Sequence, residues 1–144
     1  MKPLLIDLNV LLDVILERQP DAEPATRLWA MIERGAGPAL IPAHGVTTIF
    51  YLLATARGAA FARAGIERML TVFGVAPIDT AVLRRALTFG WSDFEDAVCA
   101  AAAEAAGCHA IVTRDASGYR SAGLHVIDPA AAISWLIVNA DNDR

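Results

Sequence analysis

The chain has 144 residues, which is the length of one ordinary domain and enough to bury a substantial core. Hydrophobic residues make up 56% of the sequence and charged residues 19%, so the composition indicates a compact globular protein. The net charge of −4 and the pI near 5.2 exclude a protein that binds nucleic acid indiscriminately through positive charge.

No stretch of the sequence is predicted to direct secretion or to cross a membrane. Lys2 is followed by Asp7 and Asp13, which interrupt the apolar core that a secretory signal needs. Residues 35–56 carry no charge, but their glycines, prolines and histidine leave no uninterrupted apolar run of about 18 residues. We therefore expect no membrane span and place the protein in the cytoplasm.

The two cysteines, Cys99 and Cys108, match neither a zinc-binding spacing nor a disulfide framework. Both stand where small buried apolar residues would serve, so we expect them to be reduced and structural. The high apolar content suggests in addition that part of the surface is buried against a partner protein or a second copy of the chain.

Short apolar runs alternate along the chain with segments of helical pattern. The first run, from Pro3 to Ile6, closes on Asp7, as expected for a central parallel strand. Asn9 is the predicted N-cap of a helix over about residues 10–17, which Pro20 ends. Further helices are predicted over about residues 22–34, 43–56, 59–71 and 82–89 (this one capped by Thr80), and further strands over residues 39–41, 72–76 and 124–127.

The C-terminal part completes this pattern. A last helix is predicted to begin at Asp128-Pro129 and to end near Val138. We therefore expect a single domain over residues 1–138 and a polar C-terminal tail over residues 139–144. Strands that alternate with helices predict an α/β fold with a parallel sheet.

The stretch from Trp91 to Asp115 is predicted to deliver two carboxylates, one on a helix and one after a strand. Ser92 is the predicted N-cap, and Glu95 three residues later completes a capping box, so the helix is expected to begin at Asp93. Capping accounts for Glu95 and leaves the aspartates near it without a structural explanation.

Asp93 and Asp96 are three residues apart, which places them on one face of the first helical turn. Gly107 fits the left-handed position at the end of this helix, and residues 110–112 have the pattern of a short buried strand. That strand runs into Thr113 and Asp115, so it places a carboxylate just past its carboxyl end. In open α/β sheets this is the edge where binding sites form.

Three aspartates, Asp7, Asp96 and Asp115, thus come from separate segments that meet at one sheet edge. Carboxylates brought together repel, and their pKa values rise unless a cation neutralises them. Their hard oxygen ligands suit Mg²⁺ or Mn²⁺, ions that can generate hydroxide and support in-line phosphoryl displacement. The structural alternative is that each acid is a helix cap or a solvated loop residue.

Three segments resemble the motifs of the PIN domain family. The segment Leu5-Ile-Asp-Leu-Asn-Val-Leu-Leu-Asp13 is similar to the opening of that domain. Asp93-Phe-Glu-Asp-Ala97 and Ile111-Val-Thr-Arg-Asp115 are similar to its later motifs, in the same order and at matching spacing. The resemblance extends from about Leu4 to Leu136.

This resemblance implies a three-layer fold with a central five-stranded parallel sheet in the order 3-2-1-4-5, flanked by helices. It implies a metal-dependent ribonuclease, a hydrolase that cleaves RNA phosphodiester bonds with Mg²⁺ or Mn²⁺. Many small bacterial members are VapC-type toxins, which an antitoxin protein neutralises and which are often homodimers. By position, Asp7, Asp96 and Asp115 would be the catalytic metal ligands, with Asn9 and Thr113 as polar supports.

One position departs from the family pattern. The family usually has a glutamate in its third helix, where this sequence has Thr48, and no acidic residue occurs between Glu33 and Glu67. A threonine hydroxyl can bond a bound water but adds no charge. One hypothesis is that Asp93 restores part of the missing charge. The other is a weakened or inactive PIN-like module that binds RNA or a protein partner.

A few other polar residues have two interpretations each. Asp13 is either solvated or a support for the site, and the first interpretation is favoured. His44 opens a predicted helix near the expected site edge, from which it could touch a substrate. Two arginine groups could hold phosphates, although solvated helix faces are the commoner explanation for such groups; they are Arg57, Arg63 and Arg68, and Arg84 and Arg85.

Overall fold

The computed structural model describes residues 1–119 and 123–142. Within these ranges the chain forms five strands, seven α-helices and one short 3₁₀ helix. The strands are β1 (Leu4–Ile6), β2 (Ala39–Pro42), β3 (Gly74–Ala76), β4 (Ala110–Val112) and β5 (His125–Ile127). The helices are α1 (Leu8–Ile15), α2 (Ala22–Glu33), α3 (Ala43–Arg57), α4 (Ala59–Val72), α5 (Thr80–Thr88), α6 (Phe94–Ala105), η1 (Ala116–Tyr119) and α7 (Pro129–Asn142).

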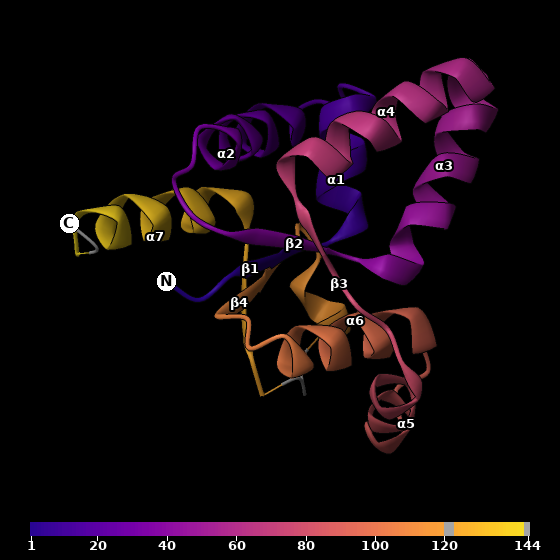
Figure 1. Cartoon of the computed structure of the whole chain (residues 1–144), viewed down its shortest axis with the longest axis vertical. Coiled ribbons are helices and arrows are strands. Elements are labelled where there is room, and N and C mark those ends of the chain that lie inside the picture. The colour runs from indigo at the N-terminus through magenta and orange to yellow at the C-terminus, as the bar shows by residue number, and fades with distance from the viewer. Residues whose placement is uncertain (120–122, 143–144) are drawn as a thin grey trace.

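All five strands pair in parallel, in the order β3-β2-β1-β4-β5. This confirms the predicted sheet and its strand order. Helices cover both faces of the sheet, and the α3–α4 hairpin extends past its edge at the upper right of Figure 1. The strands run to the same edge with their carboxyl ends, so the loops after β1 and β4 meet there.

Alternation along the central strands divides the core into two layers. Leu4 and Ile6 of β1 pack in the larger cluster, with side chains from α1, α2, α3, α4 and α7. Leu5 faces the other way, into the cluster built mainly from α5 and α6. Because both faces of the sheet are covered, every residue of β1 is buried, which explains the unbroken apolar run in the sequence.

Three helix starts differ from the prediction, and in each case an aspartate is the N-cap. Asp7 caps α1 in place of the predicted Asn9, which lies inside the helix. Asp79 caps α5 by accepting a hydrogen bond from the Val82 amide, in place of Thr80. Asp93 caps α6 in place of Ser92, so the predicted capping box is not formed.

Two boundaries also move. Helix α1 ends at Ile15, before the predicted Glu17, whose φ of 53° lies in the left-handed region. Helix α7 continues to Asn142, so the described part of the predicted polar tail is helical. Residues 143–144 of that tail lie outside the described residues.

Two other expectations concern the interior and the membrane. Cys99 and Cys108 are both buried and unpaired, as predicted. Among the helices of the described residues, none combines the length and the apolar character needed to cross a membrane.

Candidate active site

Asp7 lies at the carboxyl end of β1 and is almost completely buried. Its Oδ1 accepts a hydrogen bond from the Leu8 amide at 2.8 Å, and its Oδ2 accepts one from the Thr113 hydroxyl at 2.9 Å. Burial raises the pKa of Asp7, and these hydrogen bonds limit the rise. A buried carboxylate of this kind indicates either a structural hub or a cation site.

Thr113 connects the acidic residues of two strand ends. Its hydroxyl donates its one proton to Asp7, and therefore accepts from Asn9 Nδ2 at 3.1 Å and from the Asp115 amide at 3.2 Å. This arrangement turns Asn9 Oδ1 the other way, and within the described part of the chain that buried atom has no hydrogen-bond partner. The two predicted polar supports thus lie beside Asp7.

Replacing Thr113 by valine is expected to weaken the site without changing its shape. The methyl group leaves the Asp7 carboxylate without its donor, and it leaves Asn9 and the Asp115 amide without their acceptor. We expect a loss of about 1–3 kcal/mol of folding free energy and a fall in Mn²⁺ affinity of about 10–100-fold. Thermal unfolding and Mn²⁺ titration measure both. Thr113→Ser keeps the hydroxyl and should retain most of the affinity; an equal loss in both variants would contradict the role of the hydroxyl.

Asp96 lies in the first turn of α6, facing the same sheet edge. Burial, together with repulsion from Asp93 and Asp7, raises the pKa of Asp96 to about 6. Asp93 accepts a hydrogen bond from the Asp96 amide at 3.1 Å, so it is both the helix cap and a neighbouring charge. The charges of Asp7 and Asp93 therefore both oppose ionisation of Asp96.

Asp115 is oriented differently from the other two predicted ligands. Its backbone amide bonds to Thr113, but its carboxylate is exposed and accepts hydrogen bonds from the Ser117 hydroxyl and amide. Those bonds lower the pKa of Asp115. Across residues 1–119 and 123–142, no three His, Cys, Asp or Glu side chains are placed to share one ion. The structure thus couples Asp7 with Asp96 and leaves the Asp115 carboxylate outside that pair.

Asp13 is not solvated, contrary to the favoured interpretation. Its side chain is 2% exposed and accepts from Arg18 Nε and Arg114 Nε, each at 2.8 Å. Arg18 also donates to the backbone carbonyl of Asn9 at 3.3 Å. Because Arg114 stands between Thr113 and Asp115, this buried carboxylate ties α1 to the loop that carries two of the predicted site residues.

His44 and Thr48 bring α3 to the same region. His44 Nε2 lies 3.1 Å from the backbone carbonyl of Glu95, on the first turn of α6, and therefore donates to it. Its other ring nitrogen, Nδ1, is buried and unpartnered among the described residues, and the imidazole acts electrostatically on Asp7. Thr48 follows one turn later on the same face of α3 and is half-buried.

Two residues of η1 complete the surroundings of Asp96. The Tyr119 hydroxyl donates to Asp96 Oδ1 at 3.3 Å, and burial raises the pKa of Tyr119. Gly118 lies against the other carboxylate oxygen, Oδ2. Gly118 and Tyr119 were not predicted from the sequence, since no local motif links them to a helix more than twenty residues earlier.

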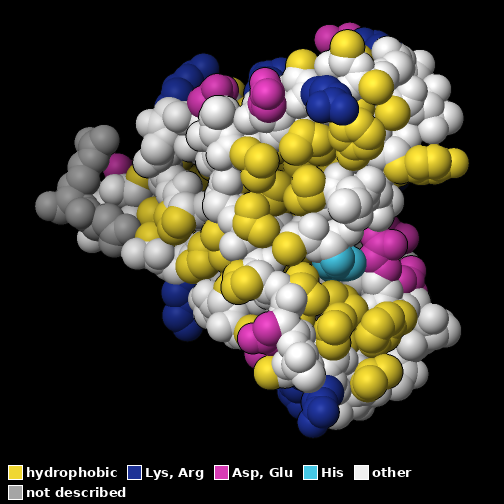
Figure 2. Space-filling view, turned by 45° about the vertical axis from the view of Figure 1, so that its right-hand side comes forward, with side chains coloured by type: hydrophobic (Ala, Val, Ile, Leu, Met, Phe, Trp, Pro, Cys, Tyr) yellow, Lys and Arg dark blue, Asp and Glu magenta, His cyan; other side chains and the backbone are white. Residues whose placement is uncertain are grey.

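The surface of this face combines acidic and hydrophobic groups. Figure 2 shows a histidine beside a group of acidic side chains, between two areas of hydrophobic surface. Helices α3 and α4 expose the large hydrophobic side chains of Tyr51, Leu52 and Leu70, and helices α5 and α6 expose those of Leu83, Leu87 and Phe94.

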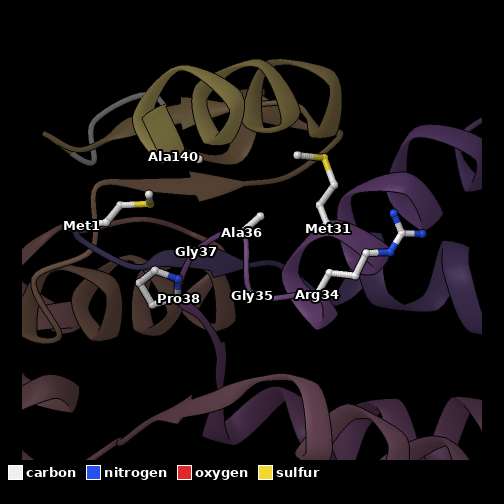
Figure 3. Close-up of a pocket in the computed structure, with 8 residues that line it drawn as sticks. All are labelled: Met1, Met31, Arg34, Gly35, Ala36, Gly37, Pro38 and Ala140. Carbon is white, nitrogen blue, oxygen red and sulfur yellow. The ribbon is translucent and has the colours of Figure 1, made fainter. Parts of the chain in front are cut away.

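A separate surface hollow of about 690 Å³ lies at the opposite edge of the sheet (Figure 3). Met1, Pro38 and Ala140 contribute to it, and of the described residues that line it only Arg34 has a charged side chain. The described lining includes no carboxylate, so its chemistry differs from that of the acidic site.

The acidic site fits a hard divalent cation. Asp7 is close enough to Asp96 for its charge to oppose ionisation of Asp96, and a cation between them would remove that repulsion. Asn9 Oδ1 adds a buried neutral oxygen that is unpartnered within the described ranges. Since Mg²⁺ is commonly held by one or two carboxylates with water as the remaining ligands, a pair of aspartates is sufficient.

Comparison with known proteins relates this arrangement to one family. A family model described as PIN domain matches residues 3–117, a span that contains Asp7, Asp96 and Asp115. No curated protein sequence matches the chain.

Several solved structures share the fold. The VapBC complex from Salmonella typhimurium, solved bound to DNA, has a TM-score of 0.71 and 15% identity, covering 90% of this chain and 99% of that one. VapC20 from Mycobacterium tuberculosis, described as a toxin that cleaves the sarcin-ricin loop, has a TM-score of 0.67 and 19% identity, covering 80% and 92%. FitAcB from Neisseria gonorrhoeae has a TM-score of 0.64 and 22% identity, covering 88% and 97%. At these identities the likeness establishes the fold.

Proposed function

Because the chain belongs to the PIN domain family, we propose that it is a Mg²⁺- or Mn²⁺-dependent ribonuclease that hydrolyses RNA phosphodiester bonds in the cytoplasm. The observation that carries the proposal is the pair of carboxylates at one sheet edge, Asp7 and Asp96, both with a raised pKa. Burial of Asp7 and its repulsion of Asp96 both disfavour the charged carboxylates, and a bound cation would relieve both effects.

In this proposal Asp7 and Asp96 hold the ion, and Asp115, whose amide shares the Thr113 hydroxyl, is the third ligand. When bound, the ion supplies an activated water and stabilises the charge on the leaving 3′ oxygen. The Thr113 hydroxyl donates a hydrogen bond to Asp7 Oδ2 and uses one lone pair of that carboxylate, which leaves its other lone pairs available to the ion. No covalent enzyme intermediate is expected.

Arginine side chains on the α3–α4 hairpin are the proposed contacts for the RNA backbone. Arg57 lies over the Phe61 ring at 5.0 Å and Arg68 over the Trp29 ring at 5.1 Å, while both remain exposed. Stacking of this kind orients a guanidinium group and leaves its edge free for phosphate. Affinity for RNA should therefore fall as the salt concentration rises.

The experiment that tests the function is cleavage of a mixed RNA pool by the purified chain, with Mn²⁺ or Mg²⁺ and with a chelator. We expect RNA cleavage that requires the ion and that leaves single-stranded DNA of matched sequence intact. Equal cleavage in the presence of chelator would contradict a metal-dependent mechanism. Binding of RNA without any cleavage, although Mn²⁺ is bound, would favour the alternative, a PIN-like module that binds RNA or a protein partner.

Replacing Asp93 by asparagine separates the charge of this residue from its role as a cap. Asparagine is as good an N-cap as aspartate, so α6 should start at the same place and the fold should be unchanged. If Asp93 supplies charge that Thr48 lacks, Mn²⁺ affinity should fall by about 10-fold, the lower end of the range for residues that act through a ligand. Calorimetric titration measures this change. An affinity equal to that of the wild type would show that the charge of Asp93 is not used.

We further propose that the protein is the toxin of a toxin–antitoxin pair and forms a homodimer. Two kinds of observation support this proposal. The similar VapBC and FitAcB structures are complexes by name, and this chain exposes large apolar side chains, Tyr51 and Leu87 among them. An adjacent reading frame that encodes a small protein able to block the RNA cleavage would support the pairing.

A further inference from the structure

The short helix η1 follows β4 and packs against α6, beside the candidate metal ligand Asp96. Tyr119 is its buried residue, with only 2% of its surface exposed. The Tyr119 ring meets Trp91 edge-on, with centroids 6.1 Å apart, and Trp91 in turn stacks on Phe89 at 5.2 Å. Packing on this aromatic group fixes the ring, and with it the position of the Tyr119 hydroxyl.

That hydroxyl donates to Asp96 Oδ1 at 3.3 Å. Asp96 is half-exposed and is repelled by both Asp93 and Asp7, so without a restraint its carboxylate would turn away from them. A hydrogen bond from a rigid donor opposes that rotation. The same hydroxyl is also a hydrogen-bond donor to Asp7, so the fixed ring acts on both carboxylates.

The second oxygen of the Asp96 carboxylate, Oδ2, occupies space that a side chain at position 118 would fill. A Cβ atom at Gly118 would lie 2.6 Å from Asp96 Oδ2 and 3.6 Å from Asp96 Cγ, and contacts shorter than 3.0 Å are essentially never seen for real Cβ atoms. The φ angle of Gly118 is not in the left-handed region, so the backbone itself would accept alanine. The carboxylate therefore provides the reason for glycine at this position.

We propose that Gly118 and Tyr119 are positioning residues, which together hold the two oxygens of the Asp96 carboxylate in the orientation that binds the divalent ion. This inference rests on the proposed metal-dependent function. Gly118 acts through Asp96, and Tyr119 acts through Asp96 and through Asp7, to which its hydroxyl is also a hydrogen-bond donor. The segment after β4 therefore carries Asp115 and, through Gly118 and Tyr119, also fixes the orientation of the Asp96 carboxylate.

The test compares Tyr119→Phe and Gly118→Ala with Tyr51→Phe, which removes a hydroxyl from an exposed tyrosine on α3. Free Mn²⁺ counted by electron paramagnetic resonance gives the affinity without RNA. We expect both η1 variants to bind Mn²⁺ about 10–100-fold more weakly, and Tyr51→Phe to match the wild type. In RNA cleavage, kcat should fall while KM for RNA stays constant.

An Asp96→Asn background shows whether the effect passes through Asp96. There, Gly118→Ala should not weaken Mn²⁺ binding any further, and Tyr119→Phe should keep only the part of its effect that passes through Asp7. Full additional losses in that background, or an unchanged Mn²⁺ affinity in Tyr119→Phe, would overturn the proposal.

A measurement without metal separates this proposal from the proposed function. The ¹³C resonance of the Asp96 carboxyl carbon, assigned by its absence in Asp96→Asn, should move in both η1 variants at fixed pH and stay unchanged in Tyr51→Phe. If the resonance moves and Mn²⁺ binds but RNA is not cleaved, the ribonuclease function fails and the positioning stands. If the resonance does not move, the positioning is wrong, whatever the activity.

Discussion

Asp96→Asn is expected to reduce metal-dependent RNA cleavage by about 10²- to 10³-fold, the loss that follows when one charge-stabilising group is removed from an active site. Asparagine keeps the size of the side chain and can still accept from Tyr119, so the surroundings of the residue should be preserved. The substitution removes one of the three carboxylates that the proposed site offers to a cation. Cleavage assays with identically purified wild type and variant measure the effect.

The same substitution should make the metal-free protein more stable at pH 7. The pKa of Asp96 is raised to about 6 by burial and by repulsion from Asp93 and Asp7. For a carboxyl with a raised pKa, the contribution to stability is complete below the unfolded-state pKa near 4 and is lost as the pH rises through about 6. Asparagine cannot ionise, so the variant avoids that loss. The two proteins should converge in melting temperature near pH 4 and differ at pH 7.

Added Mn²⁺ should reverse the order, because it stabilises the protein that binds it more tightly. A wild type that melts above Asp96→Asn with Mn²⁺, and below it without Mn²⁺, is the expected pattern. Equal RNA cleavage by the two proteins would mean that the activity comes from a contaminant or from another site.

Asp13→Ala is expected to have the largest effect on stability. It removes the carboxylate that both Arg18 and Arg114 contact at 2.8 Å, and it leaves Arg114 with a longer contact, at 4.0 Å, to the half-exposed Asp21. Breaking a buried ion pair by removing one partner typically costs about 3–5 kcal/mol. Since both arginines are about 40% exposed and can turn to water, we expect a cost below that range, about 2–3 kcal/mol. Urea unfolding monitored by circular dichroism gives the value.

Glu104→Ala is the matched control for this change. Glu104 also pairs with an arginine, accepting from Arg85 at 3.1 and 3.3 Å, but both side chains are largely in solvent. A surface pair of this kind contributes about 0–1 kcal/mol. If Asp13→Ala cost no more than Glu104→Ala, the buried carboxylate would not be an anchor, and its burial would have no energetic consequence.

The predicted elements were largely correct in type and place, and the errors at three helix starts share one cause. Asn9, Thr80 and Ser92 were each predicted to cap a helix, whereas an aspartate next to each of them is the cap. All of these residue types are good N-caps, so local preference cannot choose between neighbours. The residue that caps the helix depends on where the preceding strand or loop ends, and packing determines that position.

The candidate site was also predicted in part. Asp7 and Asp96 are brought together as expected, because parallel strands deliver their carboxyl ends to one edge. The assignment of Asp7, Asp96 and Asp115 as the metal ligands stays a prediction, since the Asp115 carboxylate bonds to Ser117 in this structure. Asp13 was misjudged because a charged residue on a short helix is usually solvated, whereas here Arg18 and Arg114, which lies in the segment after β4, both pair with it.

The alternation of strands and helices, the parallel sheet and the acidic residues at its strand ends could all be predicted from residue patterns. These follow from short-range periodicity and from the geometry common to all parallel sheets. The pairing of Arg114 with Asp13, 101 residues away, and the hydrogen bond of Tyr119 to Asp96, 23 residues away, are visible only in the folded chain. Such contacts depend on how helices pack on the sheet, and no local pattern of residues records which side chains that packing brings within hydrogen-bonding distance.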